Sequence, residues 1–333
     1  IVDSLVGSEM CIRDRFQPGV NEELAATAAW GTQMIQLYDQ PKIDGVFSLW
    51  YGKGPGLDRA MDAIRHANMG GSSKLGGMLL AVADDPIGKS STLAYQSEQS
   101  LISAGIPIFY PANVHEVVPL GLQAYQLSRY AGICVGLKIT ADTADSSAVV
   151  DLTSLRPKFK NLLNIENVHI QKHESALDRE ETLFTKRLPA SKNFIFQNKI
   201  NKIIRDPKNK NLGIIAVGKA CTETIDALER IGITDPEKNG IGIFSCKVPW
   251  PLNGEEIKNF INGYKEIFVI EEKRAVVEEQ VAHILYNHDQ KPILSGKFDG
   301  KTQEKLIPEI AELSSDIIAC LLYTSPSPRD CRL

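Results

Sequence analysis

The chain has 333 residues, of which 43% are hydrophobic and 23% are charged, and it carries a formal net charge of -4. This composition is typical of a globular protein, and the length predicts about two domains. Because the lysines and arginines are scattered, nucleic-acid binding is not expected. Because no apolar run reaches the roughly 18 residues of a bilayer span, no membrane segment is expected either.

The two ends of the chain are related to each other at the DNA level. Residues 5–14 read LVGSEMCIRD and residues 320–329 read CLLYTSPSPR. One DNA element read on opposite strands can encode both segments, and it resembles a transposase sequencing-library adapter. We therefore expect residues 1–15 and 320–333 to be adapter-derived and exclude them from fold reasoning, as for a fusion scar. The authentic part is then expected to be an internal piece of a longer chain.

The first authentic element is an alanine-rich helix within residues 16–31. Asn21 is a good N-cap, and Glu22 and Glu23 occupy the first turn, where the helix macrodipole favours negative charge. Without further information, both glutamates are typical of a solvated helix start.

A strand, a glycine turn and a helix follow. The short apolar run 46–51 predicts a buried parallel strand, and residues 57–67 carry apolar side chains at helical spacing. The turn between them, Gly-Lys-Gly-Pro-Gly at 52–56, has the spacing G-x-G-x-G. It lacks the G-x-x-G half of the dinucleotide fingerprint, so a nicotinamide or flavin site is the less favoured interpretation.

A second buried strand is predicted at 76–83 and ends in a polar loop. Gly88-Lys89-Ser90 looks like the end of a phosphate-binding P-loop, but Ala83 stands where that motif needs glycine. We therefore reject a nucleoside-triphosphatase. Ligands of open α/β sheets lie outside the carboxyl ends of the strands, where both polar turns are expected.

Helices and strands continue to alternate up to residue 151. We expect a helix at 96–104, a strand at 106–110, an amphipathic helix at 114–129 that is broken or kinked near Pro119, and a strand at 133–139. This alternation predicts βαβ units and a parallel sheet over residues 16–151.

Residues 152–211 have many charges and few apolar runs, which predicts an extended, charged linker with one or two surface helices. His169 and His173 are four residues apart, but Ile170 stands where a zincin motif has glutamate. We expect no metal site from this pair.

A second α/β unit is predicted over residues 212–295, followed at 296–319 by the start of another segment. Three strands (213–217, 241–246 and 266–270) and two helices (222–231 and 275–286) would form a small doubly wound domain. Glu271 and Glu272, at the end of the last strand, are expected to be an exposed acidic strand end.

The cysteines of the authentic part are Cys134, Cys221 and Cys246, which are far apart and form no C-x-x-C pair. This spacing predicts neither a disulfide framework nor a zinc or iron–sulfur site. We expect buried free thiols in a reducing cytosol.

Several motifs together resemble the indolepyruvate ferredoxin oxidoreductases, in particular their long fused form within the 2-oxoacid:ferredoxin oxidoreductases. They are QPGVNE at 17–22, WYGKGPG at 50–56, RHAN at 65–68, DDPIGKSST at 84–92 and SRY at 128–130. The match covers nearly all of 16–151. A looser similarity over 212–286 is to the transketolase C-terminal-like domain of that family.

The resemblance implies a thiamine diphosphate-binding fold in which residues 16–151 hold the aminopyrimidine ring of the cofactor. In this class a glutamate beside N1′ of the ring promotes loss of the thiazolium proton. The 2-oxo acid then loses carbon dioxide, and its electrons pass to iron–sulfur centres and ferredoxin. Glu22 matches the family glutamate and is our candidate catalytic residue, with Glu23 as second choice. Such a carboxyl needs a dry cleft, where desolvation raises its pKa.

The same resemblance implies further cofactor-binding residues in the two polar turns. They are Glu22 itself, Gly52, Lys53, Gly54, Pro55, Ser90, Ser91 and Glu98. The chain departs from the family in lacking a Gly-Asp-Gly…Asn motif for magnesium diphosphate and a cysteine cluster. Mg²⁺ and 4Fe–4S clusters are therefore expected in the missing part of the enzyme, no metal site is expected here, and the fragment alone is expected to be inactive.

The expected function is oxidative decarboxylation of an arylpyruvate such as indolepyruvate, with ferredoxin as acceptor, by a cytoplasmic homo-oligomer that includes further domains or subunits. One alternative is a catalytically silent α/β scaffold subunit of such a complex. A second is a Rossmann-type dehydrogenase, which would bind nicotinamide.

Overall fold

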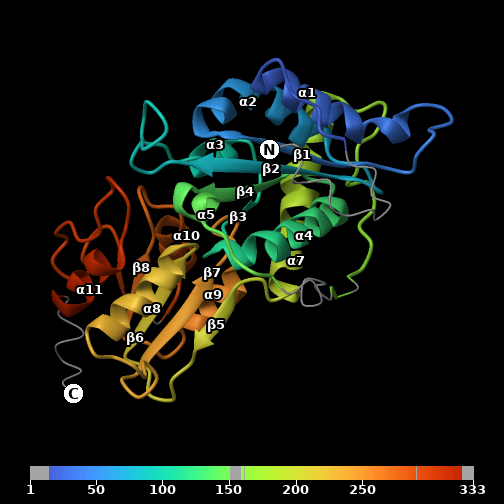
Figure 1. Cartoon of the computed structure of the whole chain (residues 1–333). Coiled ribbons are helices and arrows are strands. Elements are labelled where there is room, and N and C mark those ends of the chain that lie inside the picture. The colour runs from blue at the N-terminus through green and yellow to red at the C-terminus, as the bar shows by residue number, and fades with distance from the viewer. Residues whose placement is uncertain (1–14, 151–158, 161, 290, 325–333) are drawn as a thin grey trace.

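The computed structural model describes residues 15–150, 159–160, 162–289 and 291–324. Two α/β units follow each other along the chain, the first coloured blue to green and the second yellow to red in Figure 1. Each unit has a sheet with helices on both faces. The α/β class expected from the sequence is therefore confirmed.

The first sheet is parallel and has the strand order β1-β2-β4-β3. Its strands are β1 (Phe47–Lys53), β2 (Gly77–Asp84), β3 (Ile108–Phe109) and β4 (Val135–Thr140). Along β2, Met78 and Leu80 face one hydrophobic core while Leu79 faces the other. This alternation follows from the period of two in a strand, and burial on both faces explains why β2 is almost continuously apolar.

Helices cover the two faces of this sheet. On one face lie α1 (Glu22–Gln33), η2 (Ile35–Leu37), α2 (Gly54–Gly70) and α3 (Glu98–Ser103), and on the other lies α4 (Val114–Ala131). The side chain of Asn21 accepts a hydrogen bond from the Leu24 amide at 2.8 Å, so the predicted N-cap is confirmed. Helix α4 runs unbroken through Pro119, so the predicted break there is wrong.

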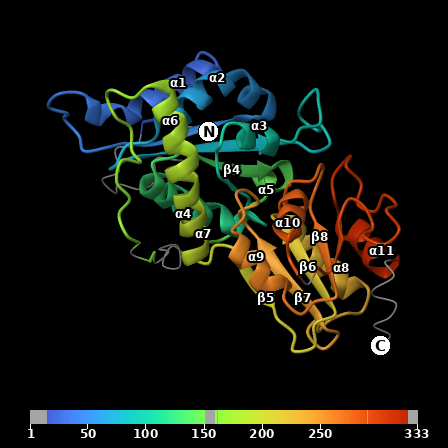
Figure 2. The ribbon, with the colours of Figure 1, turned by 180° about the vertical axis from the view of Figure 1, so that it is seen from behind.

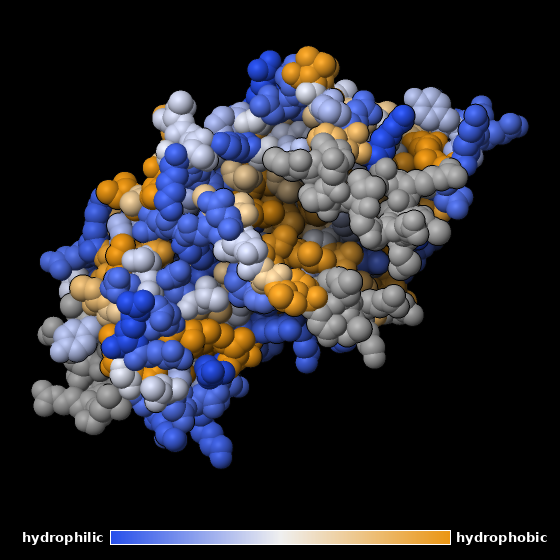
Figure 3. All heavy atoms as spheres, in the orientation of Figure 1, coloured by the Kyte–Doolittle hydropathy of each residue, from blue (hydrophilic) through white to orange (hydrophobic). Residues whose placement is uncertain are grey.

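Strand β1 forms an edge of the first sheet and exposes one row of side chains. Phe47, Leu49 and Tyr51 are 50%, 54% and 63% exposed, while Trp50 between them is buried. Hydrophobic side chains also gather near the centre of the face shown in Figure 3, over α4 and the strands beside it. The apolar surface of the first unit is thus only partly covered by its own helices.

The stretch predicted as a linker contains helices that belong to the first unit. A short helix α5 (Ala141–Asp145) precedes it, and α6 (Ala176–Thr182), the π-helical turn η3 (Leu183–Arg187) and α7 (Leu188–Gln197) then run in line beside α4 (Figure 2). Leu183, Phe194 and Ile195 are buried in the same core as α4. These are not surface helices, because one side of them packs with α4 on the same face of the first sheet.

The second sheet has the order β5-β7-β6-β8-β9, with β5 antiparallel and the other strands parallel. It contains β5 (Lys202–Arg205), β6 (Leu212–Val217), β7 (Ile241–Cys246), β8 (Glu266–Ile270) and β9 (Ile293–Ser295). The three predicted strands form its centre. The two edge strands were not predicted, since β9 is short and β5 is charged at both ends.

Four helices cover the second sheet, with α8 (Ala220–Arg230) and α11 (Ser315–Thr324) on one core and α9 (Gly254–Ile261) and α10 (Val277–Leu285) on the other. Residues 320–324 of the predicted adapter segment form the end of α11, where Leu322 is buried. Residues 1–14 and 325–333 lie outside the described residues. Across the described ranges, no helix combines the length and the apolar character that crossing a bilayer requires.

Candidate functional site

The ends of β1 and β2 bring the two predicted polar turns to one edge of the first sheet. The two strands are parallel neighbours, and their register pairs Lys53 with Ala83. Helix α2 begins at Gly54, directly after β1, and the loop of residues 85–97, here called the β2 loop, follows Asp84. This is the carboxyl edge, where ligands of such sheets bind.

Glu22 lies over the start of α2. A Cβ atom added to Gly56 would be 2.8 Å from Cγ of Glu22 and 3.4 Å from its Oε1, so the side chain fits only because residue 56 has none. The indole nitrogen of Trp50 donates to the Glu22 carbonyl at 3.0 Å and holds the end of α1 against β1. The glutamate predicted from the sequence is thus placed at the glycine turn.

The carboxyl of Glu22 is open to solvent on its other side. Its side chain is 43% exposed, and the nearest cation, Nε of Arg59, is 3.9 Å from Oε2. An ion pair this long and exposed contributes little to stability. The dry cleft expected around Glu22 is therefore not formed by the described residues alone.

The glycine turn and the β2 loop contact each other. Nζ of Lys53 donates to the carbonyl of Ser90 at 2.7 Å and to its hydroxyl at 3.1 Å. Gly54 is covered by the ring of Tyr95, which a Cβ atom at residue 54 would overlap. Pro55 is exposed in the first turn of α2. Of the predicted cofactor residues in the turn, Lys53 is therefore the one that contacts Ser90.

Asp85 fixes the shape of the β2 loop. Its carboxylate accepts hydrogen bonds from the Ser90 amide at 2.6 Å and from the Lys89 amide at 2.9 Å. The hydrogen bond from the Ser90 amide, joined by that from Lys89, holds the pKa of the Asp85 carboxyl below its usual value. Ser91 lies half-buried in the same loop. Asp85 belongs to the family motif at 84–92, but the sequence did not predict that its carboxylate shapes the loop.

Glu98 belongs to a different, buried cluster. Nζ of Lys138 donates to its Oε1 at 2.6 Å and lies 3.4 Å from Oδ2 of Asp84 and 4.6 Å from the ring centre of Tyr110. Burial raises the pKa of the Glu98 carboxyl, and Oε2 has no hydrogen-bond partner. The structure thus directs Glu98 toward Lys138, while Glu22 contacts the glycine turn.

Glu271 and Glu272 are buried, at 3% and 8% exposure, so their prediction as an exposed strand end is wrong. The Glu271 carboxylate accepts hydrogen bonds from the Val276, Val277 and Glu278 amides at 2.9 to 3.0 Å, where α10 begins. It satisfies amides that have no partner within their own helix. Glu272 accepts a hydrogen bond from the Leu313 amide at 3.0 Å.

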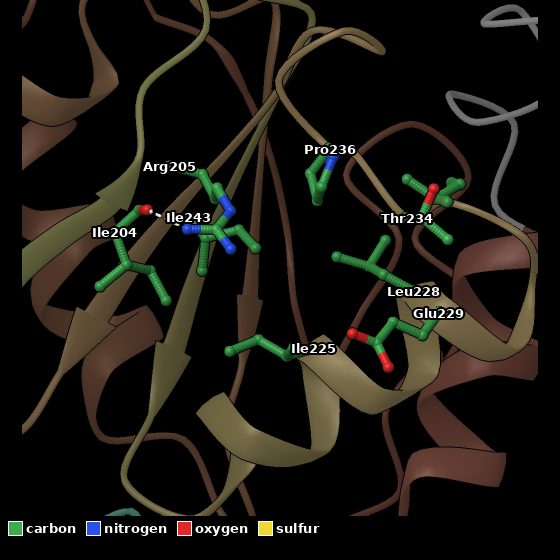
Figure 4. A pocket seen from close by; sticks show the side chains of 9 residues that line it. Ile204, Arg205, Ile225, Leu228, Glu229, Thr234, Pro236 and Ile243 are labelled. Atoms are coloured by element: carbon green, nitrogen blue, oxygen red, sulfur yellow. Dashed lines mark hydrogen bonds between the residues drawn. The ribbon is translucent and has the colours of Figure 1, made fainter.

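A small pocket lies elsewhere, in the second unit between β5, β7 and α8 (Figure 4). Ile225 and Leu228 line it from α8, and Arg205 lies at its side, donating to the Ile204 carbonyl at 2.8 Å. It offers about 30 Å³, whereas small-molecule sites measure roughly 300 to 1,000 Å³. This pocket is therefore too small for a cofactor such as thiamine diphosphate.

The residues considered for metal binding do not assemble. Free thiols are found at Cys134, Cys221 and Cys246, and all three are buried, as predicted. His169 uses Nε2 in a 2.8 Å contact with the Arg129 carbonyl, and neither it nor His173 lies on a helix. Within the described residues, no group of three or more histidine, cysteine or acidic side chains is arranged around a common metal position.

The chain resembles known proteins in sequence and in fold. A family model described as "Indolepyruvate oxidoreductase domain" matches residues 202–325. "Indolepyruvate oxidoreductase subunit IorA" of Methanothermobacter marburgensis is 25% identical over 307 residues, covering 91% of this chain and 46% of the relative. The same subunit of Pyrococcus horikoshii is 25% identical over 274 residues, covering 78% and 39%. The chain spans about half the length of the curated relatives it matches.

Two solved structures share the fold. A split-gene transketolase, described as an inactive beta4 tetramer, gives a TM-score of 0.54 at 10% identity and covers 93% of this chain and 83% of its own. A 2-oxoglutarate:ferredoxin oxidoreductase from Magnetococcus marinus gives 0.60 at 14% identity, with 92% and 56% covered. The resemblance stated from the sequence motifs is confirmed by the family model and the named relatives, and the transketolase-like α/β fold is confirmed by these structures.

Proposed function

We propose that this indolepyruvate ferredoxin oxidoreductase-like chain provides the residues that hold the aminopyrimidine half of thiamine diphosphate in a 2-oxoacid:ferredoxin oxidoreductase. The observation that carries the proposal is the placement of the Glu22 carboxyl against Gly56, at the carboxyl edge of the first sheet. When bound, the cofactor supplies the carbanion chemistry of decarboxylation.

The residues around Glu22 fit a flat polar ring. The Tyr95 ring lies over Gly54 and the Glu22 side chain over Gly56, so the first turn of α2 is covered and the open side of Glu22 faces solvent. The Glu22 carboxylate has free acceptor positions on its exposed side, since its one ion pair is long. A ring laid against the exposed side of Glu22 would share a proton with Oε1 or Oε2 and would exclude water from the carboxyl.

Glu22 is suited to hold a proton during the reaction. A ring bound against the carboxyl would replace the water that now surrounds it, and loss of water disfavours a charged group. The start of α2 lies beside it, and the positive end of that helix dipole favours the charged form. These opposing effects would keep the carboxyl able to exchange a proton, which is the requirement for a general acid–base group.

The β2 loop has a second part in the proposal. Lys53 holds Ser90 beside the glycine turn, so Ser90 and Ser91 would border the bound ring or the substrate. Glu98, which is buried, would support the carboxyl edge of the sheet through its ion pair with Lys138. In the turn, Lys53 and Pro55 are exposed and would contact the cofactor, whereas Gly52 is half-buried and Gly54 lies beneath the Tyr95 ring.

The substrate and partners are proposed from the named relatives. Their printed function favours indolepyruvate, an arylpyruvate, as the 2-oxo acid, and the solved ferredoxin oxidoreductase has the same fold. Ferredoxin would accept the electrons, and Mg²⁺ and 4Fe–4S clusters would be bound by other domains or subunits. We place the complete enzyme in the cytoplasm as a homo-oligomer.

The test is Glu22→Gln in the complete enzyme, which removes the titrating proton and keeps the shape. Ferredoxin reduction with indolepyruvate is expected to fall by about 10² to 10⁴, the usual contribution of a positioned proton-transfer group. Glu23→Gln is the matched control, because Glu23 is in the same turn and exposed. Circular dichroism would confirm that both variants fold.

Full turnover in both variants would favour the scaffold alternative. Loss of activity in Glu23→Gln with retention in Glu22→Gln would assign the proton to Glu23. The chain by itself is expected not to reduce ferredoxin with indolepyruvate, and reduction by it would contradict the division of the cofactor site proposed here.

A further inference from the structure

The four residues after β8, Glu271 to Arg274, each contact a different partner through their side chains. Glu271 and Glu272 stay within the second unit, on the start of α10 and on Leu313. Lys273 and Arg274 reach across to the first unit and contact the β2 loop. The end of β8 is therefore the point from which the second unit contacts the candidate site.

Lys273 holds the first end of the β2 loop. Its Nζ donates a hydrogen bond to the Pro86 carbonyl, and both residues are buried. Its backbone has φ of 59°, in the left-handed region that L-residues other than glycine, asparagine and aspartate seldom adopt. A long side chain in that conformation persists only where the surrounding contacts require it.

Arg274 holds the other end. Its amide and its Nε donate to Oε1 of Gln96 at 3.1 and 3.2 Å, and Nε2 of Gln96 donates back to the Arg274 carbonyl at 3.1 Å. The guanidinium also donates to Oε1 of Gln99 at 3.3 Å. Two adjacent residues of the second unit thus hold residues 86 and 96, the two ends of one loop.

The middle of the loop has a further connection to the second unit. Nζ of Lys89 is 3.5 Å from Oδ1 of Asp142, whose Oδ2 accepts a hydrogen bond from Lys219 at 2.7 Å. Between its held ends the loop presents Ser90 to Lys53 at the glycine turn. The held ends therefore fix where the loop brings Ser90 to Lys53.

We infer that Lys273 and Arg274 are positioning residues, by which the second unit sets the place of the β2 loop over the glycine turn. The inference rests on the proposed function, because the loop matters for catalysis only if that turn binds the cofactor. The two residues touch the loop and not the reacting atoms. The second unit, on this view, adjusts the site without contributing to the chemistry.

The first measurement is hydrogen exchange in the complete enzyme, comparing wild type with Lys273→Met and Arg274→Ala. The Lys89, Ser90 and Tyr95 amides bond to Asp85 and depend on the loop keeping its shape. Their exchange is expected to accelerate about tenfold, the effect of losing one hydrogen bond, while peptides of β1 and α2 are unchanged. Arg230→Ala is the control, since Arg230 is exposed on α8 and pairs with Asp226 and Asp316.

The second measurement is kinetic. Both variants are expected to raise the KM for thiamine diphosphate or for indolepyruvate about tenfold, with kcat little changed. Lys273→Arg, which keeps a donor for the Pro86 carbonyl, is expected to have a KM close to that of the wild type. A general loss of folding would instead lower kcat and thermal stability together.

The outcomes separate the two proposals. Unchanged exchange in the β2 loop would overturn the positioning role whatever the kinetics. Faster exchange with unchanged KM values would overturn the link between loop and site. If the enzyme with Glu22→Gln as its single substitution retains full activity, the proposed function fails, although the exchange result on the loop would still stand.

Discussion

Gly56 decides where the carboxyl of Glu22 lies. The glutamate side chain occupies the space where any other residue at 56 would place its Cβ. Gly56 is inside α2, and its φ is not in the left-handed region, so an alanine there is free of backbone strain. Glycine is therefore needed at this position to make room for the Glu22 side chain, and not to allow an unusual backbone conformation.

A substitution at this residue separates stability from function. Gly56→Ala is expected to keep or raise the unfolding free energy, by up to about 1 kcal/mol from helix propensity, because Glu22 is half exposed and free to turn away. Activity of the complete enzyme is expected to fall at least about tenfold, since the carboxyl would be misplaced. Urea denaturation and ferredoxin reduction measure the two effects.

Gly31→Ala is the control for Gly56→Ala. It is also a helical glycine, in α1, and a Cβ added there meets nothing within 4 Å. It should stabilise without affecting turnover. Full activity in Gly56→Ala would mean that the contact between Glu22 and α2 has no part in the reaction.

Among the elements, those with sustained apolar patterns could be predicted from the sequence and those held by buried charges could not. The strands around Leu79 and Ile214 are short apolar runs next to glycines, and the N-cap at Asn21 is local chemistry. Residues 176–197 read as surface helices because their buried side includes Arg187. Glu271 read as exposed because no local pattern shows that three amides of α10 face it.

The candidate site divides in the same way. Glu22 and the glycine turn were found through a family motif, and the structure brings them together. The contacts of Lys273 and Arg274 with the β2 loop join residues 187 and 178 positions apart. No periodicity or spacing within one segment contains such a contact, so it becomes visible only in the folded chain.

Arg187 ties the η3 turn to the end of α2. It is fully buried and donates to the carbonyls of Val168, Asn68, Met69 and Gly70 at 2.6 to 3.2 Å. Three of these carbonyls belong to the last turn of α2, which has no partners for them within the helix. Burial lowers the pKa of Arg187 to about 10, so the guanidinium stays charged at neutral pH.

Arg187→Met is expected to lower the unfolding free energy by about 3 to 5 kcal/mol, because it leaves several buried carbonyls without donors. Lys186→Met is the control, since Lys186 is the neighbouring residue of the same turn and is exposed. Its effect should stay within about 0.5 kcal/mol. Equal denaturation midpoints for the two variants would show that water replaces the guanidinium.

On the scale of the whole molecule, β3 and the residue that follows it, Tyr110, contact both units. The Ile108 and Tyr110 amides donate to the Trp250 and Lys247 carbonyls at 2.8 and 2.7 Å. The ring of Tyr110 is buried in a core of the second sheet, against Gly218. The two sheets therefore share a strand end and should unfold together.

Calorimetry of the chain is expected to show one transition, with calorimetric and van't Hoff enthalpies equal. Tyr110→Ala removes the shared ring at a cost of about 3 to 5 kcal/mol and is expected to split the transition in two. Tyr51→Ala is the control, because it removes a tyrosine that is 63% exposed. A single transition at a lower temperature in Tyr110→Ala would mean that the main-chain contacts suffice for coupling.

The edge strand β1 has a practical consequence for producing this protein. Its backbone hydrogen-bonds to β2 on one side, and its row of Phe47, Leu49 and Tyr51 faces water. An uncovered strand with such a row is a template for stacking of one molecule on another. The isolated recombinant chain is thus expected to aggregate least when stored dilute and cold. Leu49→Lys is the simplest substitution to slow its aggregation during storage.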